Sequence, residues 1–283
     1  MKIAWIGTGV MGKPMALHLA KKGHEVTVFN RTLSKIEDMK NDCRLSNSVA
    51  QCVENADVVF TIVGFPTDVR EVYLGDEGIL KNVKEHTIVV DMTTSSPTLA
   101  KEIYREAKKL NVYSLDAPVT GGDKGAREAT LSIMVGGDKD KFENILNLLE
   151  VLGKTVTYMG EAGNGQNTKL ANQMAIAGSI AGVAEALAFA HSKNIALDDV
   201  LNVINNGSAS SWQGINSGPK MVANDRSAGF FIKHFIKDLR LGQDEKQDLT
   251  LNISKAVLEE YEQLLEKGYG DFGTQAIIDY YKK

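Results

Sequence analysis

A lysine stands at the start of a helical segment that is otherwise almost free of charge. Lys169 is followed three and four residues later by Asn172 and Gln173, so the three side chains share one face of a helix. A lysine ammonium in a polar setting can donate the proton that an alkoxide needs when a carbonyl is reduced by hydride, and the neutral amine can take it back. The alternative is a surface cation whose stem covers apolar neighbours.

A glycine-rich turn near the start of the chain predicts a site for a dinucleotide. Gly7-Thr8-Gly9-Val10-Met11-Gly12 matches G-x-G-x-x-G between a predicted strand and a predicted helix. The first glycine suits a tight turn, the second lets a pyrophosphate approach the backbone, and the third lets the helix pack on the strand. The helix N-terminus offers unpaired N–H groups to the phosphate. A purely structural glycine turn is the alternative.

The end of the second predicted strand bears on the choice between NADP and NAD. A carboxylate there would accept hydrogen bonds from the adenosine ribose and favour NAD. The chain has Asn30-Arg31-Thr32 instead, and Arg31 can form a charge-assisted bond with a 2′-phosphate. We therefore predict NADP, with NAD possible, unless Arg31 is a solvated surface cation. We also assign Val63, at the end of a later strand, to the cofactor site.

Two further segments lie where a substrate could bind. Asp91-Met92-Thr93-Thr94-Ser95 follows a strand, and open α/β sheets bind ligands at the carboxyl ends of their strands. In Thr120-Gly121-Gly122 a hydroxyl precedes paired glycines, whose backbone N–H groups no side chain covers. This pattern predicts a carboxylate site, and an ordinary glycine turn is the alternative. Phe230 and Lys237-Asp238 could close over a cleft, although a surface salt bridge explains the charged pair equally well.

The first half of the chain alternates short apolar runs with amphipathic stretches, which is typical of a parallel sheet wrapped by helices. Predicted strands are Ile3–Ile6, Val26–Phe29, Val58–Val63, Thr87–Asp91, Val112–Leu115, Leu131–Val135 and Val156–Tyr158. Predicted helices between them include Pro14–Lys22, Pro97–Leu110 and Asp138–Leu152.

The character changes from Gly163 onward, where helical periodicity continues and no convincing strand follows. Predicted helices are Gln166–Lys193, Leu197–Asn205, Gly214–Met221, Ile236–Gln247 and Leu251–Lys267. The sequence thus predicts an α/β fold with two domains joined by a long interdomain helix. Residues 1–163 would form a Rossmann domain on a parallel sheet that binds NAD(P). Residues 164–283 would form an all-α domain for substrate binding and dimerisation.

Composition excludes several classes of protein. The 283 residues are 43% apolar and 24% charged, close to the average for soluble globular proteins. A net charge of −4 gives no indication of a nucleic-acid or anionic-membrane partner. Cys43 and Cys52 are too few for a disulfide framework and lack metal-ligand spacing, so we expect no metal and a reducing compartment.

One segment has nearly the length of a membrane span. Leu170–Ala190 is rich in small and apolar residues, yet it carries Asn172, Gln173, Ser179 and Glu185, which hydrocarbon would penalise. We therefore predict a buried core helix and no membrane association. Because the sequence begins directly with a strand pattern, we expect no signal peptide and a cytoplasmic location.

Taken together, these motifs resemble the β-hydroxyacid dehydrogenase family, and within it the 3-hydroxyisobutyrate dehydrogenase and glyoxylate/succinic semialdehyde reductase branches. The resemblance covers essentially the whole chain, because several spaced motifs occur in the family's order. The segments that carry it are Gly7–Met15, Asp91–Thr94, Asp116–Gly122, Gly163–Asn172 and Lys237–Leu239.

The resemblance implies a role for each matching residue. Lys169 corresponds to the catalytic lysine. Residues implied to contact the substrate are Thr94, Thr120, Gly121, Gly122, Asn172, Phe230 and Asp238. Residues assigned to the cofactor are Gly7, Thr8, Gly9, Val10, Met11, Gly12, Asn30, Arg31, Thr32, Val63, Thr94 and Lys237. The chain departs from the family pattern in having Thr120 for serine, Ala129 for glycine and Gln173 for asparagine, which leaves the preferred substrate open.

The implied activity is reversible hydride transfer between NADP or NAD and a small carboxylated alcohol or semialdehyde, with Lys169 as general acid and base. Substrates of the 3-hydroxyisobutyrate, succinic semialdehyde or glyoxylate class are implied, as is a homodimer or homotetramer. Three alternatives remain: a non-catalytic cofactor-binding protein, an imine reductase and a decarboxylating dehydrogenase. Lys169 argues against an imine reductase, and the chain is much shorter than enzymes similar to 6-phosphogluconate dehydrogenase. A cofactor sensor would have no reason to keep Lys169, Thr120 and Asn172 together.

Overall fold

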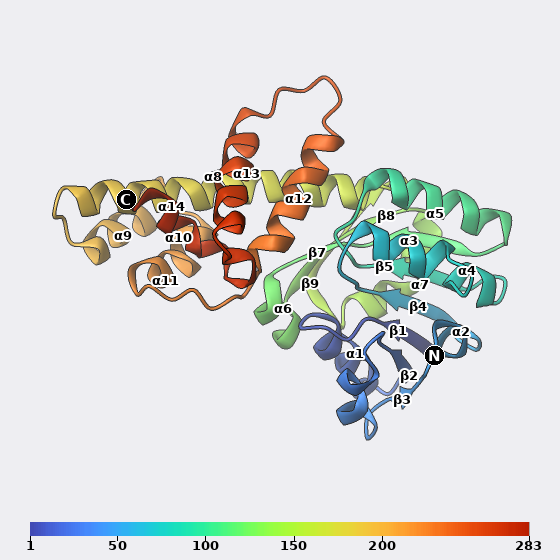
Figure 1. The fold of residues 1–283 in the computed structure, drawn as a ribbon. Helices are drawn as coiled ribbons and strands as arrows, with labels where there is room; N and C mark the ends of the chain where they lie inside the picture. The colour runs from blue at the N-terminus through green and yellow to red at the C-terminus, as the bar shows by residue number, and fades with distance from the viewer. Residues whose placement is uncertain (283) are drawn as a thin grey trace. The chain divides into compact units, whose positions relative to one another are not determined.

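The computed structural model describes residues 1–282 and divides into two compact units, Met1–Lys169 and Leu170–Lys283 (Figure 1). The division falls inside one long helix. The predicted domain boundary at 163/164 stays a prediction, and Lys283, the last residue of the predicted helical domain, lies outside the described residues.

The first unit is built on an open α/β sheet. Its strands are β1 Lys2–Ile6, β2 Glu25–Phe29, β3 Arg44–Leu45, β4 Val58–Thr61, β5 Ile88–Asp91, β6 Tyr113–Asp116, β7 Val119–Thr120, β8 Leu131–Gly136 and β9 Gly153–Gly160. The strands β3, β2, β1, β4, β5 and β6 lie side by side in this order and run parallel. The order reverses between β1 and β4, which is where open sheets of this type bind ligands. The predicted Rossmann domain with a parallel sheet is therefore confirmed.

The far side of this sheet departs from the parallel arrangement of the other strands. β8 runs antiparallel to β6 and to β7, while β9 returns parallel to β8. The reason lies in the connection from β7, which is a tight turn and the short helix α6 Gly122–Glu128. So short a link lets the chain fold back on β7 but is too short for a parallel crossover.

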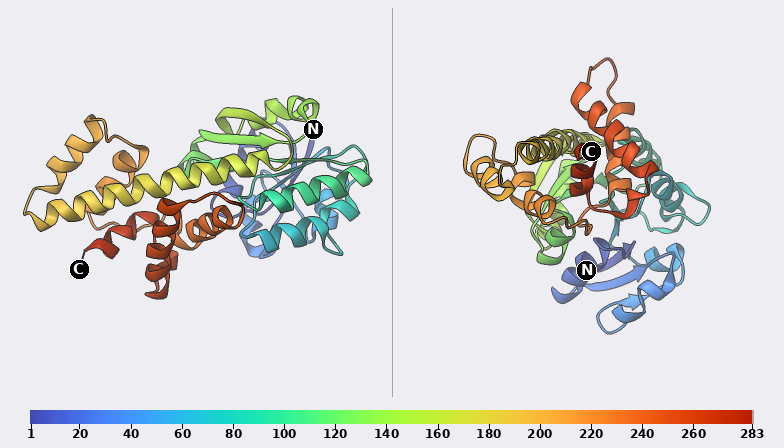
Figure 2. Two further views of the ribbon diagram at one scale, coloured as in Figure 1. Left: turned by 90° about the horizontal axis from the view of Figure 1, so that it is seen from above. Right: turned by 60° about the vertical axis from the view of Figure 1, so that its left-hand side comes forward.

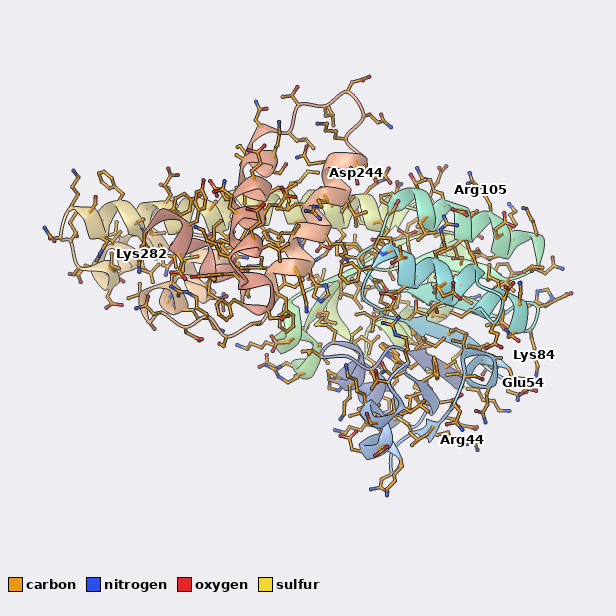
Figure 3. The ribbon with its side chains drawn as sticks, viewed as in Figure 1. Arg44, Glu54, Lys84, Arg105, Asp244 and Lys282 are labelled. Carbon is orange, nitrogen blue, oxygen red and sulfur yellow. The ribbon has the colours of Figure 1, made fainter. Side chains whose placement is uncertain are left out.

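Helices cover both faces of the sheet, and a separate apolar core lies on each face. One core contains side chains from α1 Gly12–Lys21, α6 and α7 Lys139–Leu149. The other contains side chains from α2 Val49–Val53, α3 Pro66–Leu74, α4 Ile79–Asn82 and α5 Pro97–Lys109. Arg44, Glu54 and Lys84, labelled in Figure 3, lie on the outside of the unit and are exposed.

Within residues 170–282 the second unit contains helices and their connections and no strand, apart from an isolated bridge between Phe231 and Gly273. Its helices are the greater part of α8 Asn164–Ser192, then α9 Leu197–Asn206, α10 Trp212–Asn216, α11 Gly218–Val222, α12 Ile232–Asp244, α13 Asn252–Glu266 and α14 Ile278–Tyr281. Short 3-10 turns are Leu33–Lys35 and Glu37–Met39 in the first unit and Tyr269–Asp271 and Thr274–Ile277 in the second. The predicted all-α domain and long helix are confirmed.

The helix α8 is the long unbroken helix of Figure 2, drawn there in yellow-green to yellow. Among residues 1–282 it is the one helix that has the length and composition to cross a membrane. Ala177, Ile180 and Leu187 are fully buried in the core of the second unit, whereas Ala171 and Ala175 are exposed. The prediction of a buried core helix therefore holds for one face only.

All predicted strands are present within a few residues, but some other predictions need correction. Val63 lies two residues beyond the end of β4, and the two-residue strands β3 and β7 were missed because they are too short to show alternation. The predicted helix Gly214–Met221 is two short helices, α10 and α11, because the chain bends at Ser217 before Pro219. A proline favours a helix start and disfavours its interior.

Candidate active site

The glycine-rich loop joins β1 to α1 at the carboxyl end of β1. Gly7 has φ +95°, and a Cβ there would lie 2.1 Å from the carbonyl oxygen of Ile62. A Cβ at Gly12 would lie 2.0 Å from the carbonyl oxygen of Gly7, so a side chain would push α1 off the loop. A Cβ at Gly9 would meet none of the described atoms within 4 Å. The fold itself requires Gly7 and Gly12, whereas Gly9 leaves open space beside the start of α1.

The hydroxyl of Thr8 tests whether this loop fits a phosphate. Thr8 Oγ1 is buried and has no hydrogen-bond partner among the described residues, while the backbone N–H of Thr8 donates to Asn30 Oδ1 at 3.1 Å. A buried hydroxyl that lacks a partner costs about 1–3 kcal/mol. A phosphate oxygen could accept its proton, and the open start of α1 suits the same anion. The loop therefore fits the pyrophosphate of a dinucleotide.

The residues predicted to read the adenosine ribose follow β2. Asn30 Nδ2 donates to the carbonyl oxygen of Thr32 at 3.0 Å, so the Asn30 side chain braces both this turn and the glycine-rich loop. The Arg31 side chain is 88% exposed and its Nη1 lies 3.2 Å from Oδ1 of Asp68, near the start of α3. An exposed ion pair of this kind contributes about 0–1 kcal/mol. A phosphate could therefore displace Asp68 from Arg31 at little cost.

Neighbouring strand ends are linked by their side chains. Thr61 on β4 donates to Asp91 Oδ1 on β5 at 3.0 Å, and the backbone N–H of Thr93 donates to the same oxygen at 3.0 Å. Thr93 Oγ1 accepts from the N–H of Val63 at 2.9 Å. A Cβ on Gly7 would lie 3.3 Å from Val63 Cγ1, so Val63 lies beside the glycine-rich loop. Val63 is thus bonded to the residue that precedes the half-buried Thr94.

The carboxyl group of Asp116 on β6 binds the first turn of α8. Asp116 Oδ1 accepts from the backbone N–H of Gly163 at 2.7 Å, and Oδ2 accepts from the N–H of Gln166 at 2.8 Å. Burial raises the pKa of Asp116, while these two hydrogen bonds act in the opposite direction. Burial also raises the pKa of Asp91, its partner in the β5–β6 register, to about 6. Hydrogen bonds from Thr93 and Thr61 oppose that shift.

Gln166 connects the same turn of α8 to the segment after β5. Its Nε2 donates to the carbonyl oxygen of Thr93 at 2.7 Å, and its Oε1 accepts from the N–H of Ser95 at 2.9 Å. Lys169 follows Gln166 by three residues and is 5% exposed. The alternative that Lys169 is a solvated surface cation is therefore excluded.

The turn predicted to hold a carboxylate follows β7. Gly121 has φ +129° and Gly122 has φ +63°, a backbone conformation that strains residues with side chains. Thr120 is half-buried, and a Cβ on Gly121 would approach Leu131 Cδ2 to 3.2 Å. The turn therefore requires glycine for its own conformation, and its role as a carboxylate site stays a prediction.

In the second unit, four polar side chains form a connected row. Asn172 Nδ2 donates to Gln173 Oε1 at 3.0 Å, and Gln173 Nε2 donates to Asp238 Oδ2 at 2.8 Å. Lys237 Nζ lies 3.1 Å from Asp238 Oδ1, and both side chains are largely buried. The surface salt bridge that the sequence allowed is thus excluded. Phe230 is not part of this row and packs edge-to-face on Phe235 at 5.9 Å.

The structure places the predicted residues in two sets. The first unit contains Gly7–Gly12, Asn30–Thr32, Val63, Thr94, Thr120–Gly122 and Lys169, and the second contains Asn172, Phe230, Lys237 and Asp238. Within residues 1–282, no group of three or more His, Cys, Asp or Glu side chains could hold a metal ion.

Three residues of the first unit were missed as functional candidates. Asp68 follows Pro66 at the start of a helix, a pattern that indicates an N-terminal acid but not its distant partner Arg31. Asp116 and Gln166 stand inside recognised motifs, yet their spacing gives no sign that they bond to the same helical turn.

Comparisons with known proteins agree with this geometry. The family model of the NAD binding domain of 6-phosphogluconate dehydrogenase matches residues 2–160. A second family model matches residues 163–281 and describes the NAD-binding part of NADP-dependent 3-hydroxyisobutyrate dehydrogenase.

Similar relatives and solved structures extend over nearly the whole chain. A 3-hydroxyisobutyrate dehydrogenase-like protein of Arabidopsis thaliana is 42% identical over 98% of this chain and 84% of its own. The 2-hydroxy-3-oxopropionate reductase of Escherichia coli is 38% identical over 89% of this chain and 87% of its own. The structure of Mycobacterium tuberculosis 3-hydroxyisobutyrate dehydrogenase with L-serine has a TM-score of 0.91 at 28% identity, covering 100% of this chain and 99% of that one.

Proposed function

We propose, on the premise that this chain belongs to the β-hydroxyacid dehydrogenase family, that it reduces small carboxylated aldehydes with NADPH in preference to NADH. Membership makes it an NAD(P)-dependent oxidoreductase of the 3-hydroxyisobutyrate dehydrogenase-like type. The observation that carries the proposal is Lys169, which is buried at the start of α8 in a turn bonded to the strand ends around the cofactor loop.

The preference for NADP rests on Arg31 and on the absence of a carboxylate at position 30. Asn30 uses its side chain to brace the loop, so it presents no negative charge to a 2′-phosphate. Arg31 is exposed and is paired with Asp68 through a weak ion pair that a phosphate would replace. Lys237, held by Asp238 in the second unit, is proposed as a second cation for the cofactor.

Lys169 is proposed as the general acid and base. A bound nicotinamide would supply or accept the hydride. The Lys169 ammonium would donate a proton to the substrate oxygen as the carbonyl carbon gains hydride, giving the alcohol and the oxidised cofactor. In the reverse direction the neutral amine would take the hydroxyl proton. Asn172, one helical turn later on the same face of α8, would orient the substrate oxygen.

Thr120, Gly121 and Gly122 are proposed to bind the substrate carboxylate through a hydroxyl and backbone N–H groups. Gly121 and Gly122 adopt positive φ and have no side chains of their own to cover these groups. The Escherichia coli relative is named for a short carboxylate that bears an aldehyde, and the Mycobacterium tuberculosis structure contains L-serine, a small hydroxy acid. Both names support a short carboxylated substrate for this chain, such as succinic semialdehyde, glyoxylate or methylmalonate semialdehyde.

The experiment compares kcat/KM for succinic semialdehyde with kcat/KM for butanal at saturating NADPH. Because butanal has no carboxylate to accept from the hydroxyl and the backbone N–H groups of this turn, we expect it to be worse by at least about a hundredfold. Thr120→Val, which keeps the shape of the side chain, should lower kcat/KM for the semialdehyde and leave that for butanal unchanged. Equal efficiencies for the two aldehydes would show that the turn is only structural.

We further propose a cytoplasmic protein that forms a homodimer or homotetramer through α8. The outer face of α8 carries exposed Ala171, Ala175 and Gly182, and Phe189 near its end is 64% exposed. An exposed apolar face with small residues suits close packing of a second copy. Sedimentation equilibrium gives the mass in solution, and a monomer at all concentrations would contradict this part of the proposal.

A further inference from the structure

Two buried polar side chains, Asp116 and Gln166, bind the first turn of α8, and the proposed reaction gives neither of them a role. Gln166 is fully buried and Asp116 is 4% exposed. A buried polar side chain lowers stability unless its hydrogen bonds are satisfied, and an apolar side chain of the same shape avoids that cost. Polar groups at these two buried positions are explained if their hydrogen bonds are needed to hold the first turn of α8 in place.

Asp116 acts as the capping residue of α8 although it lies on a distant strand. The first N–H groups of a helix have no partner within the helix, and a side chain next to the helix start usually accepts from them. Gly163 has no side chain, and its φ of +89° turns the chain into the helix. The carboxylate of Asp116 accepts from Gly163 and Gln166 instead. The start of α8 is thereby tied to the end of β6.

Two glycines make room for this carboxylate. A Cβ on Gly165 would lie 2.5 Å from the carbonyl oxygen of Met134 and 2.8 Å from Asp116 Oδ2. A Cβ on Gly136 would lie 2.7 Å from Asp116 Oδ1 and 2.8 Å from the backbone nitrogen of Gly165. The backbones of β8 and α8 therefore lie so close to Asp116 that neither position has room for a side chain.

Gln166 fixes a second segment to the same turn. Its amide bonds to the backbone on both sides of Thr94, at Thr93 and Ser95. Lys169 is less than one turn further along α8. One rigid turn therefore connects Thr94, which is proposed to lie beside the cofactor, with the proposed proton donor.

We propose that Asp116 and Gln166 are positioning residues that set the place of Lys169 relative to Thr94. This inference rests on the proposed function, because it assigns their effect to Lys169. A helix is stiff over one turn, so a displaced first turn displaces the lysine with it. Displacement of a reacting group by about 1 Å can lower a rate by about a hundredfold.

The first test is Asp116→Asn, in which one oxygen still accepts but the amide nitrogen faces an N–H donor. We expect kcat to fall by roughly tenfold or more while the Kd for NADPH changes by less than about threefold. The matched control is Ile145→Ala in α7, which removes buried apolar volume from a core of the same unit that contains no side chain of α8. Even if Ile145→Ala lowers the melting temperature as much as Asp116→Asn does, the kcat of Ile145→Ala should stay near that of the natural protein.

A double-mutant cycle with Lys169→Ala separates positioning from general damage. If Asp116 acts through Lys169, Asp116→Asn should lower the residual single-turnover rate of Lys169→Ala by less than about threefold. The inference would be overturned if Asp116→Asn lowered the rate by the same factor in Lys169→Ala as in the natural protein. A folded Asp116→Asn protein with normal kcat would also overturn it. If Asp116→Asn does not fold, Gln166→Met takes its place in the same cycle under the same criteria. Normal turnover of Lys169→Ala alone would instead overturn the proposed function.

Discussion

Two Gly-x-Gly turns each lead into an α-helix, and the structure uses them in opposite ways. Gly7-Thr8-Gly9 leads into α1, where Gly9 borders open space and Thr8 Oγ1 has no partner among the described residues. Gly163-Asn164-Gly165 leads into α8, where Asp116 accepts from the helix N-terminus and fills the space that a ligand would need. We call the first the open turn and the second the closed turn.

The difference shows that glycines before a helix do not by themselves indicate an anion site. Both turns present backbone N–H groups at a helix start, where a negative charge is favourable. In the closed turn that charge belongs to the protein, so the turn serves to position the helical residues after it. In the open turn the charge has to come from a ligand. Substitutions at the closed turn should therefore change kcat, and substitutions at the open turn should change the affinity for the cofactor.

The largest effect is expected for the residue that the closed turn positions. Lys169→Ala should lower kcat by roughly 10²–10⁴-fold and leave the affinity for NADPH nearly unchanged, because the proton donor is lost and the open turn is intact. Lys169→Arg should not restore the rate, since guanidinium stays protonated and has a different shape. Steady-state kinetics and cofactor titration check this, and near-normal kcat in either variant at saturating substrate would remove Lys169 from the mechanism.

Asp91, which is paired in the β5–β6 register with Asp116 of the closed turn, should make stability depend on pH. Its carboxyl accepts hydrogen bonds from Thr61 and Thr93, and burial raises its pKa from 3.8 to about 6. The folded state thus favours protonated Asp91, so its contribution to stability is full below about pH 4 and is lost as pH rises through about 6. Relative to Asp91→Asn, the free energy of unfolding should fall by about 3 kcal/mol between about pH 4 and 7. Denaturant unfolding at each pH measures the free energy of unfolding of both proteins. A difference between them that does not change with pH would contradict a raised pKa for Asp91.

Matched alanine substitutions in the two turns should separate binding from stability. Gly165→Ala would place a Cβ 2.5 Å from Met134 O, so we expect a loss of about 1–3 kcal/mol in unfolding free energy. Gly9→Ala meets no described atom, so the melting temperature should be retained while the Kd for NADPH rises by about tenfold. Calorimetry and cofactor titration on both variants are required. A stability loss at Gly9 that matches the loss at Gly165 would remove the distinction between the turns.

The smallest effects are expected at the edge of the open turn. Arg31→Ala should raise the KM for NADPH by about tenfold and barely change that for NADH, because only the 2′-phosphate is read. Asp68→Asn should lower the KM for NADPH relative to the KM for NADH by a few-fold. The reason is that the substitution frees Arg31 from its present partner. Equal effects of Arg31→Ala on both cofactors would show that Arg31 does not bind the phosphate.

Local sequence was sufficient for the parts of the fold that depend on local conformation. The roles predicted for the three glycines agree with their surroundings. A Cβ would clash at Gly7 and Gly12 and would meet open space at Gly9. The short apolar runs located the central strands β4 and β5 because these strands are buried on both faces. The two amides after Lys169 favoured a polar setting over the surface for its side chain, and that side chain is 5% exposed.

Features that depend on pairing between distant segments were not predictable. The direction of β8 depends on how β7 and α6 turn the chain, and Gly121–Ala129 consists of glycines, charged residues and two alanines, which show no strand or long helix pattern. The partner of Arg31 is Asp68, 37 residues away, and the capping residue of α8 is 47 residues before Gly163. Spacing along the chain says nothing about such contacts, because only the strand order brings the residues together.

The closed turn also fixes the phase of α8, which has a consequence for insertions and deletions. An α-helix turns by about 100° and rises by about 1.5 Å per residue, so the direction of each side chain is set by its count from the first fixed residue. In α8 that count starts at Gln166 and reaches Lys169 after three residues. One added or lost residue between them would rotate Lys169, Asn172 and every later side chain to another face. The length of this interval, more than the identity of its residues, is what the helix cannot vary.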